Sequence, residues 1–118
     1  MIFMKVKDAL PLKLVWKIKG SGDMKLRLSK HAKQKIDERK VRVEDIKEVV
    51  KDAEIVFYDI DSKAFVSIGK IVFEGVETNL VVVYKKEKEA IKIITVYPCR
   101  DIEKEIKRKE VKRWIRIR

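Results

Sequence analysis

The only histidine of this chain, His31, lies near the start of a stretch that predicts a basic helix over residues 29–40. Histidine is the side chain that most readily exchanges a proton near neutral pH. Ser29 is a favourable N-cap, so we expect His31 in the first helical turn, where backbone N–H groups attract an anion. His31 is therefore a candidate general acid or base beside a bound phosphate. The alternative interpretation is a half-exposed histidine on a solvated basic face.

Cationic side chains accompany this histidine on the same predicted helix. They are Lys30, Lys33, Lys35 and Arg39, within a segment, residues 25–40, that carries seven Lys and Arg against two acidic residues. This local charge is enough to hold a phosphate, and it makes Lys30, Lys33 and Lys35 candidate RNA-binding residues.

A second basic segment closes the chain. Residues 98–118 carry nine Lys and Arg against four acidic residues, and Arg108 and Lys112 are candidate RNA-binding residues there. Residues 41–62, in contrast, carry three basic and seven acidic residues. If the two basic segments lie side by side, they form one electropositive surface.

The overall composition also favours an anionic partner. The 118 residues include 30 Lys and Arg and 19 Asp and Glu, which gives a formal net charge of +11 at pH 7. Nucleic acid is the first partner to consider, followed by an anionic membrane surface or an acidic protein. Charged residues make up 42% of the chain, as in hyperthermophilic proteins, where many charges serve ion-pair networks.

Cysteine usage and hydropathy bear on the location of the protein. Cys99 is the only cysteine, which excludes an internal disulfide, and the sequence shows no signal peptide. No apolar run approaches the ~20 residues of a membrane span. We therefore expect a cytoplasmic protein with no membrane segment.

The sequence contains few motifs for nucleotide or metal chemistry. It has no glycine-rich phosphate loop, and a single histidine with a single cysteine essentially excludes a zinc site. Asp59 and Asp61 could attract a metal, but Asp-Ile-Asp-Ser is also an ordinary turn, so we expect no metal and no cofactor. General acid–base chemistry without a metal remains open.

Residues 1–23 are predicted to form an N-terminal β extension ahead of a single domain over residues 24–118. Apolar and polar residues alternate along residues 12–18, which is typical of a half-buried strand. The apolar face of this strand must be buried, either on its own sheet or by exchange with a second copy of the chain. Of these two arrangements we favour the homodimer.

The remaining residues predict an α+β domain. Two N-terminal helices, over 29–40 and 43–53, follow a short strand at 26–28 and pack on a sheet. Four further segments are rich in Val, Ile, Phe and Tyr and are joined by short turns: residues 55–60, 64–73, 79–85 and 90–97. Such connections favour an antiparallel meander of about four strands. Residues 101–109 predict a C-terminal helix. The basic chain end beyond it is either a strand or a tail that binds a partner.

The order of several short motifs resembles a known family of small domains. His31-Ala32 opens a helix, Arg39 precedes a hydrophobic second helix, and residues 93–98 close with Thr-x-Tyr in the sequence Ile-Ile-Thr-Val-Tyr-Pro. That family is catalogued as of unknown function and is similar to the RelE-type toxins, within the wider group of barnase, EndoU and colicin ribonuclease domains. The resemblance covers about residues 25–100. It implies two helices on an antiparallel sheet and metal-independent cleavage of RNA, often on the ribosome.

The same resemblance carries over four candidate catalytic residues: His31, Arg39, Thr95 and Tyr97. Cleavage of RNA by its own 2′-hydroxyl requires a base, a group that neutralises the phosphate and an acid for the leaving oxygen. His31 could be the base or acid, Arg39 a bidentate phosphate clamp, and Tyr97 a stacking platform or second acid. Thr95 would position the substrate by a hydrogen bond.

The spacing of His31 and Arg39 along the predicted helix limits how they could act together. Eight residues separate His31 from Arg39, about 12 Å along the helix axis and about 80° around it, so the two cannot clamp one atom. Arg39 could instead be a cation that stabilises the helix C-terminus, and Tyr97 an aromatic residue packed on the sheet.

Two classes of function therefore compete. The first is an RNA-binding protein of toxin-like type that cleaves RNA without a metal, with an antitoxin-like protein as a second partner. Such a partner would cover the basic face with an acidic or apolar segment. The second is a noncatalytic module of RelE-like fold that binds RNA or protein.

Overall fold

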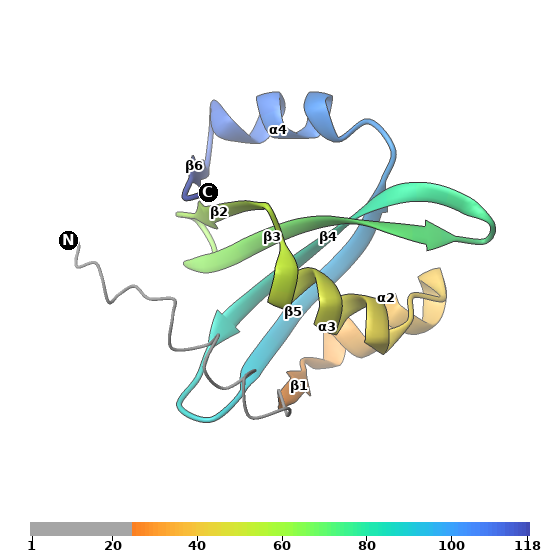
Figure 1. The fold of residues 1–118 in the computed structure, drawn as a ribbon. Helices are drawn as coiled ribbons and strands as arrows, with labels where there is room; N and C mark the ends of the chain where they lie inside the picture. The colour runs from red at the N-terminus through yellow and green to blue at the C-terminus, as the bar shows by residue number, and fades with distance from the viewer. Residues whose placement is uncertain (1–24) are drawn as a thin grey trace.

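The computed structural model describes residues 25–118, so the predicted N-terminal β extension lies outside the described residues. The predicted α+β fold is confirmed (Figure 1). Its elements are β1 (Leu26–Leu28), α2 (Lys30–Arg39), α3 (Val43–Asp52), β2 (Ile55–Asp59), β3 (Ala64–Phe73), β4 (Val76–Lys86), β5 (Ile91–Cys99), α4 (Ile102–Glu110) and β6 (Trp114–Arg116). Within residues 25–118, no helix is long and apolar enough to cross a membrane.

The strands form one mixed sheet in the order β1-β5-β4-β3-β2-β6. The four central strands, β2 to β5, pair antiparallel in chain order, as the predicted meander requires. The sheet is wider than the predicted four strands because the predicted short strand at 26–28 and the chain end after α4 both join its edges. β1 adds to β5 in parallel, and β6 adds to β2 antiparallel, which shows that the chain end after α4 is a strand.

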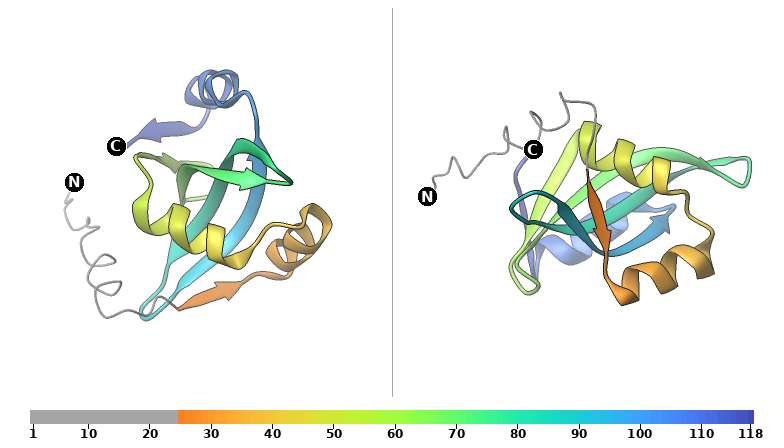
Figure 2. Two further views of the ribbon diagram at one scale, coloured as in Figure 1. Left: turned by 45° about the vertical axis from the view of Figure 1, so that its right-hand side comes forward. Right: turned by 90° about the horizontal axis from the view of Figure 1, so that it is seen from below.

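The helices cover both faces of the sheet, with α2 and α3 on one face and α4 on the other (Figures 1 and 2). β4 shows why, because its buried residues alternate between the two faces. Leu80 and Val82 belong to the core cluster that includes Ala32 of α2 and Ile46 of α3. Val81 and its neighbours on that face pack with Ile106 of α4 and with Trp114.

A β-bulge in β5 changes which residues share a face. Val83 pairs with Thr95 and Tyr84 pairs with Ile93, which leaves Ile94 as the extra residue. Ile93 and Val96 consequently belong to the same core cluster although they are three positions apart. In an unbroken strand, residues three apart point to opposite faces. The bulge therefore turns the end of β5, with Tyr97, toward α4.

Candidate functional site

Helix α2 holds His31 and Arg39 at its two ends. Ser29 caps the helix as predicted, because its Oγ accepts a hydrogen bond from the Ala32 amide at 2.9 Å. The Ser29 hydroxyl also donates to the Ile94 carbonyl at 3.1 Å, so the helix begins against the bulge of β5. His31 is exposed in the first turn.

Arg39 joins the other end of α2 to β5. Its Nη1 donates to the Val96 carbonyl at 2.7 Å, beyond the stretch of β5 that β1 covers. Lys40 then takes a left-handed conformation with φ of 53° and ends the helix, its amide pointing back to the carbonyls of Ile36 and Asp37. Arg39 is thus half-buried at the edge of the sheet.

Thr95 and Tyr97 face away from α2. They pair with Val83 and Val81, whose side chains pack in the core cluster beneath α4. His31 and Thr95 are therefore on opposite sides of the sheet, and the four candidate catalytic residues do not converge on one point.

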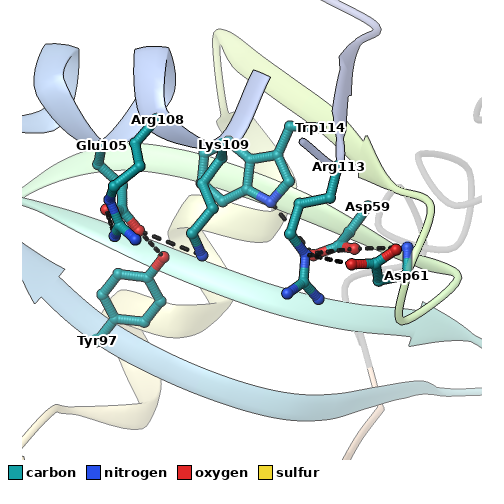
Figure 3. Close-up of polar contacts among 8 residues, drawn as sticks. All are labelled: Asp59, Asp61, Tyr97, Glu105, Arg108, Lys109, Arg113 and Trp114. Atoms are coloured by element: carbon teal, nitrogen blue, oxygen red, sulfur yellow. Dashed lines mark hydrogen bonds and ion pairs between the residues drawn. The ribbon is translucent and has the colours of Figure 1, made fainter. Parts of the chain in front are cut away.

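The Tyr97 hydroxyl is already engaged. It donates to Glu105 Oε2 of α4 at 2.7 Å (Figure 3). Burial and the hydrogen bond to Glu105 raise the pKa of Tyr97 well above its usual value. Tyr97 is consequently a poor proton carrier in this arrangement, although the residue is not fully buried.

Glu105 is the centre of a buried ionic network under α4. It pairs with Arg108, and its Oε2 lies 3.5 Å from Lys109 Nζ (Figure 3). Burial opposes ionisation of this carboxyl, but the hydrogen bonds from Tyr97 and Arg108 outweigh it, so the pKa of Glu105 lies below its usual value. Arg108, predicted to bind RNA, is thus partly committed to an ion pair within α4.

Asp59 forms a second network at the other end of α4. Asp59 is 4% exposed, and its carboxylate accepts hydrogen bonds from Arg113 Nε at 2.9 Å and Trp114 Nε1 at 3.3 Å. Asp61 lies 3.6 Å from the same guanidinium (Figure 3). Asp59 is therefore an anchor for β6. Among residues 25–118, no group of three or more His, Cys, Asp or Glu side chains could hold a metal.

Arg39 and Tyr97 both border one surface feature, although the Tyr97 hydroxyl is bonded to Glu105 of α4 on the other side of the sheet. Both line an open depression of about 550 Å³ at the edge of the sheet, beside the tip of the β3–β4 hairpin. The other lining residues are Glu38, Lys40, Phe73, Glu74 and Pro98. Sequence reasoning missed Phe73 and Pro98 as site residues, since an aromatic residue near a hairpin and a proline after a strand are common core and turn signals.

The candidate RNA-binding residues fall into two groups. Lys30 and Lys33 are exposed on α2, and Lys35 lies 3.4 Å from Glu38 on the same helix. Arg108 and Lys112 are on and just after α4, on the opposite face of the sheet. The two basic segments therefore do not form one flat electropositive surface, because the sheet separates them.

The fold is a small α+β domain with a mixed sheet between two helical layers. Residues 28–98 match the family described as Domain of unknown function (DUF4258), and the chain belongs to this family. No curated protein and no solved structure matches the chain.

Proposed function

We propose that this chain is an RNA-binding protein, and that the contact surface consists of α2 and the depression at its C-terminal end. The observation that carries the proposal is that Arg39 and Lys40 line this depression at the end of the basic helix α2. Arg39 offers a planar guanidinium suited to phosphate, and Phe73, which lines the same depression, offers an aromatic ring for a base. The exposed lysines of α2 and the net charge of +11 supply the electrostatic attraction.

Metal-independent cleavage of RNA is the second candidate function. Arg39 favours it, because its guanidinium would neutralise the charge of a phosphate bound at this depression. The resemblance to RelE-type toxins supports the same chemistry, with ribosome-associated RNA as substrate and an antitoxin-like protein as partner. The separation of His31 from Arg39 along α2 and the engaged Tyr97 hydroxyl favour the noncatalytic module instead.

A cytoplasmic location fits the proposed function. RNA is available there, and the single cysteine, Cys99, has no need of an oxidising compartment.

The test is incubation of the purified chain with total RNA in the presence of a chelator. Gel retardation without shortened products supports the binding module, whereas cleavage that persists with the chelator supports the nuclease. Arg39→Gln removes the charge yet retains a side-chain amide to bond the Val96 carbonyl, and it should weaken RNA binding about tenfold. The matched control is Lys104→Ala, an exposed cation on α4. Absence of any RNA binding by the wild-type chain would refute the proposal.

A further inference from the structure

A second depression continues the first along the sheet. It has a volume of about 250 Å³ and is lined by Phe73, Glu74, Val76, Thr78, Pro98 and Arg100. Phe73, Glu74 and Pro98 line both depressions, so the two form one groove between the end of α2 and the β3–β4 hairpin. We call this feature the hairpin groove.

The floor of the hairpin groove is an uncovered part of the sheet. Phe73 pairs with Val76 at the hairpin tip, where β4 extends past the last β5 residue, Cys99. The left-handed Lys40 ends α2 before this region, and Val76 is 48% exposed. Apolar and aromatic surface at the base of a groove bordered by cationic side chains is typical of sites that hold a base.

One buried polar atom in the groove wall has no partner. Thr78 is 8% exposed, and its Oγ1 makes no hydrogen bond among the described residues. A buried hydroxyl without a partner destabilises the protein, and valine has nearly the same shape without that cost. A threonine at this position is therefore explained if its side chain turns toward the groove and a bound molecule supplies the missing partner.

Cationic side chains stand at both ends of the groove. Arg39 and Lys40 line the first depression, and Arg100, which is exposed, lines the second. Arg39 uses Nη1 to bond Val96, and a guanidinium has further N–H groups to offer. Glu38 and Glu74 also line the groove, so three cations accompany two carboxylates. The positions of Arg39 and Arg100 suit a ligand with a flat apolar centre and negative charge on either side.

We propose that the hairpin groove binds one unpaired nucleotide of an RNA strand. The base lies against Phe73 and Pro98, the Thr78 hydroxyl bonds a polar atom of that nucleotide, and the flanking phosphates lie at Arg39 and Arg100. A paired base is stacked inside its duplex and cannot enter such a groove, so the substrate class is single-stranded RNA. This inference rests on the proposed RNA binding and specifies which RNA is bound and where.

The experiment compares a labelled single strand of about ten nucleotides with the same strand in a blunt duplex. The wild-type chain should bind the single strand about tenfold more tightly. Phe73→Leu, which keeps apolar volume but removes the ring, should abolish most of that preference. Val72→Ala, at an exposed neighbouring position of the same hairpin, should not change it.

Thr78→Val provides an independent test, because this variant should fold normally and a loss of affinity could not be ascribed to unfolding. Removal of the unpartnered hydroxyl should leave the melting temperature equal or higher, while affinity for the single strand falls about fivefold. Equal affinity of the wild type for single strand and duplex would overturn the proposal, as would full binding by both Phe73→Leu and Thr78→Val. RNA binding as such would survive those results, whereas a wild-type chain that binds neither probe would refute both proposals.

Discussion

Tyr97 shows how a residue chosen for its chemistry can be held by its surroundings. Its hydroxyl donates to Glu105, a carboxylate that is 9% exposed and is also paired with Arg108 and Lys109. A buried carboxylate is tolerated only when such partners compensate for its lost hydration. The Tyr97 hydroxyl therefore helps to keep Glu105 charged, and this role connects β5 to α4.

Glu105→Gln should make the protein less stable at neutral pH. The pKa of Glu105 is lower in the folded chain than in the unfolded chain, so its stabilising effect is complete above the unfolded value, about 4.3. The effect is lost as the pH falls through the folded value. We expect a loss of about 1–3 kcal/mol in the free energy of unfolding near pH 7, and a smaller difference near pH 3.

Denaturant titration at both pH values measures this difference. Glu103→Gln, at an exposed position of the same helix, is the matched control and should change little. If Glu105→Gln lowers the free energy of unfolding by the same amount at both pH values, the charge of Glu105 does not stabilise the fold.

At the level of the elements, the sequence predicted the four central strands and the short strand at 26–28, but it did not predict how the two edge strands pair or which face the last residues of β5 present. Long apolar alternation in β3 and β4 is a strong signal, whereas β1 and β6 have three residues each and acquire strand structure only by pairing. The Ile94 bulge has no signal in a continuous apolar run, so the face of Tyr97 could not be read from alternation. Arg39 was chosen from the family resemblance, and helix spacing correctly predicted that it lies far from His31 along α2.

The contact between α3 and β3 depends on a glycine. A Cβ at Gly69 would lie 3.1 Å from Val49 Cγ2, closer than such atoms normally approach. Gly69→Ala should therefore destabilise the protein by about 1–2 kcal/mol. Val49→Ala should remove the steric conflict, so the double variant should be more stable than the sum of the two single effects predicts, by about 1 kcal/mol. Denaturant unfolding of the wild type, the two single variants and the double variant measures this coupling. Strictly additive effects would show that α3 moves away from β3 to accommodate the added Cβ.

Across the whole molecule, the sheet divides the positive charge. α2 carries its exposed lysines on one side, and α4 carries Lys104 and Lys107 on the other. The hairpin groove lies beside α2 and not α4. This asymmetry separates a face for RNA from a basic face that other partners, such as the proposed antitoxin-like protein or a second copy of the chain, could use.

The salt dependence of RNA binding should therefore come mainly from the α2 side. Replacement of Lys30, Lys33 and Lys35 by Ala should reduce the slope of log affinity against log salt by about two, since each phosphate contact on a single strand contributes about 0.7. The matched triple replacement of Lys104, Lys107 and Lys112 removes the same charge from the α4 side and should leave the slope nearly unchanged. An equal reduction of this slope by both triple variants would mean that RNA wraps around the edge of the sheet and contacts both faces. Direct contact would be required because long-range attraction is screened within about 10 Å at moderate salt.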